Sequence, residues 1–186
     1  TFTTGGGGPI NQWLSYDNGI NNDALGFSGF NFDAVIRFPA AAIQEYLGAR
    51  ITHIRFFPYF GSTAYYSVEM YTGPNPDANN PVFFEDIPSN FVTPGEWTEY
   101  PLAESYEITE NLDLWVGLYI QDYQAGEYPM GVDSGPAASG KGDLFYNYDT
   151  SEWIALSNLE PPFDVNRNLQ VFVTNQAGKK AKLNLN

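Results

Sequence analysis

Apolar and polar residues alternate along several short stretches of the chain, and this alternation predicts β-strands. In FDAVIRF (residues 32–38), two phenylalanines, an alanine and an isoleucine fall on one face of a strand. ITHIRFFPYF (51–60) and AYYSVEMYT (64–72) predict two further strands, joined as a hairpin by a short link that contains Gly61. LDLWVGLYI (112–120) is almost entirely apolar, which is typical of a central strand covered on both faces. NLQVFVT, near the C-terminus, predicts the strand that closes the domain.

One segment has the features of a helix. PAAAIQEYLG (39–48) begins with Pro39, which suits the first position of a helix, and ends with Gly48, which suits its stop. A helix here would place Ile43 and Leu47 on the same face. About ten short strands and one short helix predict an all-β fold, namely a two-sheet antiparallel β-sandwich of jelly-roll type.

The length and the uniform composition of the middle of the chain predict a single domain. The chain has 186 residues, which is enough for one substantial core. Residues 1–8 contain the run TTGGGG and are predicted to be a flexible linker. Residues 9–174 are predicted to form the sandwich, and residues 175–186, which hold three of the eight basic residues, to form a tail.

The composition narrows the class of partner. Aromatic residues make up 17% of the chain and charged residues 16%, as expected of a strand-rich domain rather than a disordered one. The net charge of −14 argues against nucleic acid and anionic membranes as partners, because both are bound through Lys and Arg. Uncharged sugars and calcium suit such a surface better.

Several features that the sequence lacks are also informative. There is no cysteine, which excludes disulfides, zinc-thiolate sites and a cysteine nucleophile. No apolar run approaches the roughly 20 residues that span a bilayer, so membrane insertion is not expected. The chain begins with Thr1 rather than methionine, from which we expect that a signal segment or an upstream part has been removed.

The stretch GVDSGPAASGKGDLFY (131–146) contains most of a phosphate-binding loop. A Gly-x4-Gly-Lys run ending at Lys141 matches the motif, but the next residue is Gly142, which has no hydroxyl to hold magnesium. The motif also requires a helix after the loop, whereas GDLFYNYDT predicts a strand. We therefore expect no nucleotide here, but a structured loop in which Lys141 pairs with Asp133 or Asp143.

Four segments, in their order along the chain, carry a family resemblance. They are LSYDNGINNDALGF (14–27), AVIRFPAAAIQEYLGARITHIRFFP (34–58), LWVGLYI (114–120) and YPMGVDSGPAASGKGDLF (128–145). Together they are similar to the jelly-roll modules of secreted Bacteroidetes proteins, such as the cleaved adhesin (haemagglutinin) domains of gingipain-type proteases. The resemblance covers roughly residues 13–173.

The resemblance implies a β-sandwich that is secreted or displayed on a bacterial cell surface. It also implies adhesion or ligand binding rather than catalysis. The chain departs from the family near its end, where the family tends to have a tryptophan before the last strand and this sequence has FDVNRNLQVFV. A ligand contact in that corner of the family fold therefore does not carry over.

The Asn- and Asp-rich stretch YDNGINND (16–23) predicts a calcium site, because hard cations take carboxylate and amide oxygens. The candidate ligands, which include two acids from the next loop if the loops meet, are Asp17, Asn21, Asp23, Asp133 and Asp143. The spacing is not that of an EF-hand. The alternative is a turn in which the side chains bond to their own backbone. The resemblance favours structural calcium, which related modules are expected to hold.

Aromatic residues in the loop-rich part of the chain predict a sugar-binding surface. Aromatic rings stack on sugar rings while neighbouring amide and carboxylate groups bond the hydroxyls. The candidates are Tyr119, Tyr123, Tyr128 and Trp153. The alternative is packing, because the chain has 4 Trp, 13 Tyr and 14 Phe, most of which must lie in the core or at its edges.

No residue pattern indicates catalysis. His53, the single histidine, alternates with apolar residues in a strand, and no serine stands in a Gly-x-Ser-x-Gly elbow. A glycosidase needs two carboxylates at a set separation, and nothing in the sequence selects a pair. We therefore expect a non-catalytic extracellular adhesion or binding module that recognises a glycan or a host surface protein through loops at one end of the sandwich. The alternatives are a structural spacer or docking module of a larger surface protein, and a carbohydrate-active enzyme.

Overall fold

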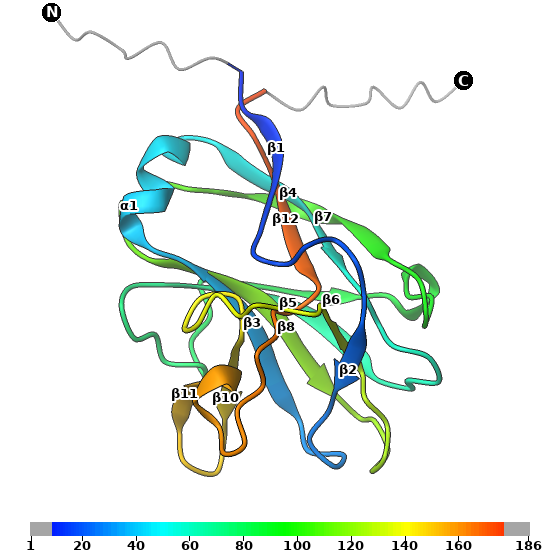
Figure 1. Cartoon of the computed structure of the whole chain (residues 1–186). Helices are drawn as coiled ribbons and strands as arrows, with labels where there is room; N and C mark the ends of the chain where they lie inside the picture. The colour runs from blue at the N-terminus through cyan, green and yellow to red at the C-terminus, as the bar shows by residue number, and fades with distance from the viewer. Residues whose placement is uncertain (1–8, 177–186) are drawn as a thin grey trace, which may run out of the picture.

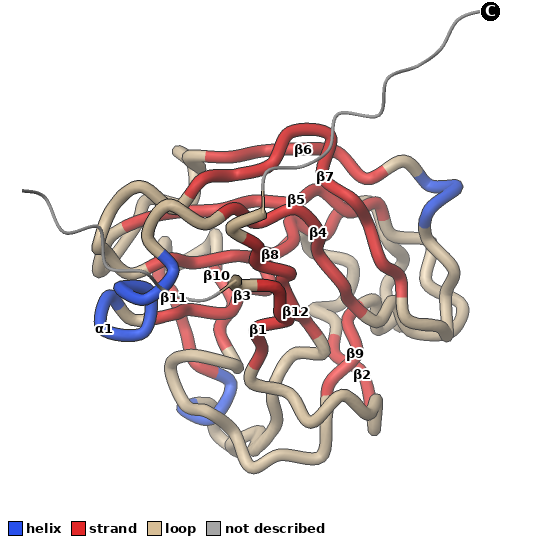
Figure 2. The backbone as a smooth tube through the Cα atoms, turned by 90° about the horizontal axis from the view of Figure 1, so that it is seen from above, coloured by secondary structure: helices blue, strands red, loops and turns tan. Residues whose placement is uncertain are grey.

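The computed structural model describes residues 9–176 and has two main antiparallel sheets and a small third one (Figure 1). The four-stranded sheet has the order β1 (Asn11–Ser15), β12 (Leu169–Thr174), β4 (Arg50–Phe56) and β7 (Thr98–Glu107). The six-stranded sheet has the order β11 (Glu152–Ala155), β10 (Leu144–Asn147), β3 (Phe32–Phe38), β8 (Leu114–Gln121), β5 (Tyr65–Thr72) and β6 (Phe83–Ile87). The third sheet pairs β2 (Asp23–Leu25) with β9 (Met130–Val132). Helical turns are few and short, and loops make up the rest of the described chain (Figure 2).

The order of the strands is that of a jelly roll. If the β10–β11 hairpin is set aside, the two sheets are β1-β12-β4-β7 and β3-β8-β5-β6. The chain passes from β3 in the large sheet to β4 in the small one, returns to β5, and crosses again at β7 and β8. This pattern is the eight-stranded double Greek key. The prediction of an all-β, two-sheet antiparallel sandwich with one short helix is confirmed.

The alternation of apolar residues seen in the sequence accounts for the layers. From β3, Phe32, Ala34 and Ile36 enter the main core between the sheets, where they meet residues such as Ile54 and Val171. The intervening Val35 lies on the outer face of the large sheet, in a second apolar cluster made of Val35, Tyr71, Trp115, Leu144 and Ala155. The large sheet is thus apolar on both faces, as the nearly continuous apolar run of β8 predicts.

Two local predictions are wrong. The helix α1 covers Ala40–Ile43 and continues as a 3₁₀ turn (Gln44–Tyr46), so it ends before Leu47, which has extended backbone angles. Leu47 is 43% exposed, whereas Ile43 is buried, because the two no longer share a helical face. The link at Gly61 does not close a hairpin, because β4 and β5 belong to different sheets and the chain crosses the sandwich there.

The ends of the described chain meet. β1 pairs with β12 along its whole length, so the first and last strands lie side by side at one end of the sandwich (Figure 1). The predicted linker (1–8) and the predicted tail beyond residue 176 lie outside the described residues. Within residues 9–176, no helix has the length and apolar character to cross a membrane.

Candidate functional site

A pocket of about 690 Å³ opens where strands β3 and β10 part. The pairing between β3 and β10 ends at the Asp33–Tyr146 pair. Beyond that pair, β10 stays paired with β11 alone, and the chain leading into β3 is a loop. The gap between the two strands leaves room for a ligand-sized space at the end of the large sheet. We call this space the aromatic pocket, lined by Phe27, Gly29, Phe30, Asn31, Phe32, Tyr119, Phe145, Tyr146, Asn147, Tyr148, Asp149 and Leu159.

Rings from both faces of the large sheet form the walls of the aromatic pocket. On the core side, Phe27 stacks on Phe145 with ring centroids 4.6 Å apart and meets Phe32 edge to face at 4.8 Å. On the outer side, Tyr148 meets Tyr146 edge to face at 4.9 Å. Because neighbouring rings hold one another, the walls are preformed rather than assembled by a ligand.

Polar groups stand at the rim of the pocket. The Asn31 side-chain amide donates to the Tyr119 hydroxyl at 2.9 Å, and the Asn147 side-chain oxygen accepts from the backbone N–H of Asp149 at 2.9 Å. Within residues 9–176, neither the Asn147 Nδ2 nor the Asp149 carboxylate has a side-chain partner for a ligand to displace. The rim therefore offers one amide donor and one charged acceptor to a ligand.

The loop that closes one side of the pocket is held by Tyr123. This residue is buried, its hydroxyl donates to the Phe30 carbonyl at 2.7 Å, and it accepts from the Phe27 N–H at 2.8 Å. These two hydrogen bonds fix the backbone from which the Phe30 ring projects, and that ring is 69% exposed. An exposed ring on a fixed loop can stack on a ligand at a small entropic cost.

A buried pair of carboxyl groups lies behind the outer wall of the pocket. Asp33 on β3 is fully buried and accepts from the Tyr148 hydroxyl at 2.9 Å, and Glu69 on β5 accepts from the Tyr71 hydroxyl at 2.6 Å. The Asp33 Oδ1 atom is buried without a hydrogen-bond partner, and each carboxyl group affects the pKa of the other. Glu69 lies opposite Gly117 on β8, and Asp33 lies opposite Tyr119, two residues further along the same strand.

The electrostatic state of this pair follows from its burial. Desolvation, and next the neighbouring Glu69, raise the pKa of Asp33 well above its usual range. Desolvation also raises the pKa of Glu69. Two carboxylates in contact in an apolar setting do not both ionise, so the pair keeps a proton at neutral pH.

The four aromatic residues predicted to bind a ligand have different positions. Tyr119 lines the aromatic pocket, and Tyr123 supports its loop without facing it. Trp153 is half-buried on the outer face of the large sheet, where it contacts Tyr146 and donates through Nε1 to the Pro76 carbonyl at 2.8 Å. Tyr128 is 52% exposed but lies outside the pocket.

Most of the pocket was not predicted from the sequence, including Phe27, Phe30, Tyr146 and Tyr148. A signal was present in the two short segments GFSGFNF (26–32) and FYNYD (145–149), where aromatic residues alternate with Gly, Asn or Asp. Such mixtures supply flat faces and hydrogen-bonding groups side by side. What the sequence did not indicate is that segments more than 100 residues apart meet at one strand end.

Two of the predicted metal ligands accept several hydrogen bonds within the protein. Asp133 is buried and accepts from the backbone N–H groups of Asn18, Gly135 and Asn166 and from the Asn166 side chain, at 2.7–3.1 Å. Asp143 is buried and accepts from the Gly140 N–H and from the N–H and hydroxyl of Ser157. Both carboxylates tie loops together and have little capacity left for a cation.

The other predicted ligands do not converge with these two. Asp23 is exposed and accepts from the N–H of the next residue, while Asp17 accepts from the side chains of Asn168 and Gln170. Asn21 has a side-chain oxygen that is buried without a partner. Across residues 9–176, no group of three His, Cys, Asp or Glu side chains is placed to hold a metal ion.

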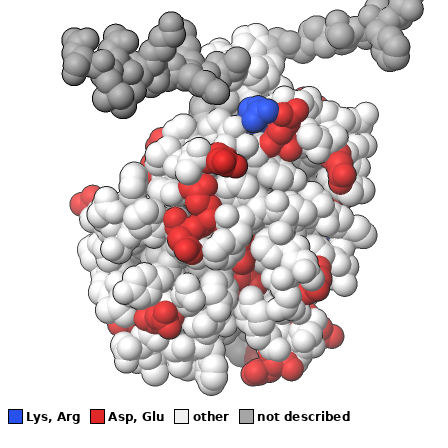
Figure 3. All heavy atoms as spheres, turned by 180° about the vertical axis from the view of Figure 1, so that it is seen from behind, with Lys and Arg blue, Asp and Glu red and all other residues white. Residues whose placement is uncertain are grey.

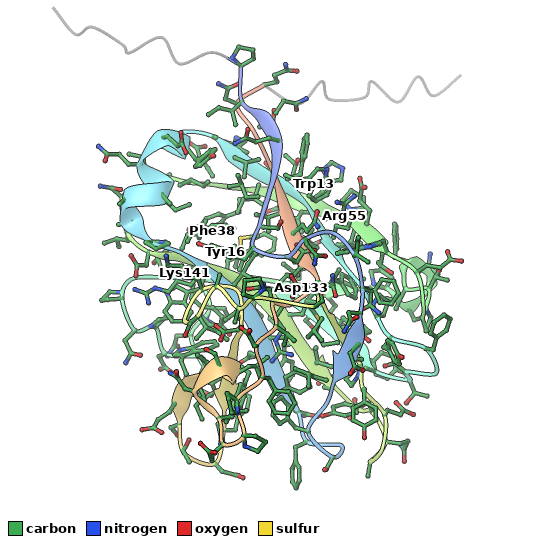
Figure 4. All side chains as sticks on the ribbon, in the orientation of Figure 1. Trp13, Tyr16, Phe38, Arg55, Asp133 and Lys141 are labelled. Atoms are coloured by element: carbon green, nitrogen blue, oxygen red, sulfur yellow. The ribbon has the colours of Figure 1, made fainter. Side chains whose placement is uncertain are left out.

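The loop that resembles a phosphate site is built for packing. Lys141 is exposed and, among residues 9–176, forms no ion pair, so the predicted pairing with Asp133 or Asp143 is wrong; Figure 4 shows Lys141 apart from Asp133. Gly142 stands where a Cβ would lie 2.5 Å from the Asn166 side-chain oxygen and 2.6 Å from Tyr16 Cβ. The glycine there permits a close approach of chains rather than phosphate binding.

Comparison with protein-family models, curated proteins and solved structures finds no match to this chain. The resemblance to gingipain-type adhesin modules therefore stays a prediction. The geometry of the site is the remaining guide to the function.

Proposed function

We propose that this protein is a non-catalytic extracellular binding module that recognises a glycan in the aromatic pocket. The observation that carries the proposal is the pocket itself, about 690 Å³ in volume and lined by aromatic rings on a rigid sheet. Its size lies in the range of roughly 300–1,000 Å³ that is typical of small-ligand sites. The secreted or cell-surface location follows from the family resemblance.

The chemistry of the pocket suits an uncharged sugar. Exposed rings such as Phe30 and Tyr148 offer flat faces to the C–H side of a sugar ring, and Asn147 and Asp149 offer hydrogen bonds to hydroxyls. On the face shown in Figure 3, acidic side chains are spread over the surface and basic groups are scarce. A net charge of −14 and Asp149 at the rim disfavour an anionic ligand at this site.

The buried carboxyl pair supports binding rather than hydrolysis. A glycosidase holds its two carboxyl groups about 5 Å or more apart on either side of the bond that is cleaved. Asp33 and Glu69 are instead both buried, and neither lines the pocket. A purely structural spacer would have no need of exposed rings around a preformed space, which favours the binding module over that alternative.

A glycan array tests the proposal with matched variants. The wild type should bind neutral glycans, and Tyr148→Ala should weaken the best signal at least tenfold, because the ring and its place in the wall are lost. Tyr128→Ala is the matched control, since Tyr128 is similarly exposed but lies outside the pocket. Phe30→Ala, which removes an exposed ring without touching the core, keeps the test open if Tyr148→Ala fails to fold. A blank array, or an equal loss in the Tyr128 variant, would contradict the proposal.

We also propose a structural calcium ion at the loop of residues 17–21, favoured by two buried oxygens. The side-chain oxygens of Asn21 and Asn168 are both buried without hydrogen-bond partners. Asn168 also reaches Asp17 and the Ile20 carbonyl through Nδ2, at 3.3 and 3.4 Å. Calcium takes amide, carboxylate and carbonyl oxygens. With the Asn168 amide turned so that Oδ1 replaces Nδ2 beside Asp17 and the Ile20 carbonyl, Asp17, Asn21 and Asn168 would hold the ion.

Calorimetry tests the calcium proposal. In protein stripped with a chelator, added Ca²⁺ should raise the melting temperature by roughly 5 °C or more, because an ion that binds the folded state stabilises it. Asn21→Ala should abolish the response, and Asn22→Ala, an exposed neighbour, should keep it. Equal melting temperatures with and without Ca²⁺ would refute the calcium proposal and would not affect the glycan proposal.

A further inference from the structure

The outer face of the four-stranded sheet carries a guanidinium group between two indole rings. The Arg55 Cζ on β4 lies 4.7 Å from the ring centroid of Trp13 on β1 and 5.1 Å from that of Trp97, just before β7. Figure 4 shows Trp13 and Arg55 next to each other on this side of the molecule. All three side chains are half-buried, so they can be reached from solvent.

The strand register extends this cluster into a band across the sheet. Trp13, Phe172 and His53 lie opposite one another on β1, β12 and β4. The Phe172 ring contacts Trp13 at 5.2 Å and His53 at 5.8 Å between centroids. The Trp13–Arg55–Trp97 band therefore continues as an aromatic surface that is half exposed to solvent and does not belong to the core.

Arg55 carries a positive charge that no carboxylate neutralises within residues 9–176. Its Nη2 donates to the Gln170 side-chain oxygen, its Nε is buried without a partner, and it forms no ion pair although Glu99 lies opposite it. By contrast, Arg37 and Arg50 are paired with acidic residues. An uncompensated cation on a chain with a net charge of −14 is a local attraction for an anionic group.

The surroundings of Arg55 limit how an anionic group could bind to its guanidinium. Because Nε is buried and Nη2 already donates one N–H to Gln170, the donors left for a ligand are Nη1 and the second N–H of Nη2, at the outer edge of the guanidinium. That edge is a planar fork of N–H donors, which matches the two oxygens of a carboxylate. The neighbouring Trp and Phe rings offer flat surfaces on which a sugar ring can stack.

We propose that this face is a second binding site, which takes a saccharide carrying a carboxylate, with Arg55 on the carboxylate and Trp13, Trp97 and Phe172 beside the sugar ring. The site is independent of the aromatic pocket, which lies at the end of the other sheet. An acidic peptide fits this face less well. β4 is paired on both sides, with β12 and β7, so its backbone has no N–H or C=O row left for a peptide strand.

Titration calorimetry with two carboxylated saccharides tests the site. Oligogalacturonate and sialyllactose cover the two common sources of a sugar carboxylate, and a neutral oligosaccharide of matched length is the reference. At least one acidic saccharide should bind saturably, more weakly as salt rises, because the contact is an exposed ion pair. Arg55→Gln should weaken it at least tenfold. Arg55→Lys should lose several-fold while keeping the charge, because an ammonium group lacks the planar fork.

Two matched variants show whether the affinity depends on Arg55 itself. Arg50→Gln removes a charge from the same strand, but one already paired with Glu107, and should leave the affinity unchanged. Tyr148→Ala should also leave the affinity for the acidic saccharide unchanged. This site can therefore be tested independently of the aromatic pocket. The proposal is overturned if neither acidic saccharide binds, if Arg50→Gln is as damaging as Arg55→Gln, or if poly-glutamate binds as tightly as the saccharides.

Discussion

Replacing Asp33 with asparagine tests the buried carboxyl pair. In the folded protein, burial and the neighbouring Glu69 raise the pKa of Asp33 above the value of about 3.9 expected in the unfolded chain. The folded state therefore binds more protons than the unfolded state at any pH between the two values. Stability is greatest at low pH within that window and falls as the pH rises through it.

The size of the effect follows from proton linkage. One extra proton bound by the folded state changes the free energy of unfolding by about 1.4 kcal/mol per pH unit. Between pH 5 and pH 7 the wild type should lose up to roughly 3 kcal/mol from this source. Asparagine is neutral at every pH and can donate a hydrogen bond to Glu69. The free energy of unfolding of Asp33→Asn should therefore depend much less on pH, and its stability relative to the wild type should increase as the pH rises.

Urea unfolding at several pH values between 5 and 8 measures this difference. Glu69→Gln should flatten the slope only in part, because desolvation, the largest cause of the raised pKa of Asp33, remains. Asp86→Asn is the control, since Asp86 lies on the neighbouring strand β6 but is exposed, and its slope should follow the wild type. Parallel stability curves for the wild type and Asp33→Asn would show that the pair does not hold an extra proton.

Two further substitutions test the packing around the sites. Gly117→Ala should cost about 2–3 kcal/mol in urea unfolding, because a Cβ there would lie 2.3 Å from Val35 Cγ1 and 2.4 Å from the Ala34 carbonyl; a cost below about 0.5 kcal/mol would refute the close approach. Asp133→Asn should cost about 2–4 kcal/mol in thermal unfolding, because an amide nitrogen would face N–H donors. Asp23→Asn, at an exposed position, should have a stability near that of the wild type. Equal effects of the two substitutions would contradict the role of Asp133 in holding the loops together.

The alternation of apolar and polar residues predicts individual strands well. FDAVIRF forms β3 over the predicted residues, because a strand with one face toward the core needs an apolar residue at every second position. The helix prediction failed at Leu47, where the backbone leaves helical angles. The hairpin prediction failed at Gly61 because distant pairings decide the sheet to which each strand belongs. Local patterns carry no information about those pairings.

The candidate sites were harder to predict than the strands. Asp133 and Asp143 suggested calcium because carboxylates are calcium ligands, but both accept backbone N–H groups of their own loop, and Asp133 also accepts that of Asn166. Tyr119, a predicted ligand contact, lines the pocket, whereas Tyr148 was missed because its position depends on the gap between β3 and β10. A site formed where two strands separate can be recognised only when the pairing register of those strands is known.

The central claim is that the aromatic pocket binds a neutral glycan, and amide NMR mapping tests it most directly. ¹⁵N-labelled protein would be titrated with the neutral oligosaccharide that gives the strongest array signal. We expect saturable shift changes concentrated at residues 27–32, at residues 145–149 and at Tyr119. Changes concentrated elsewhere, or no change at saturating sugar, would contradict it.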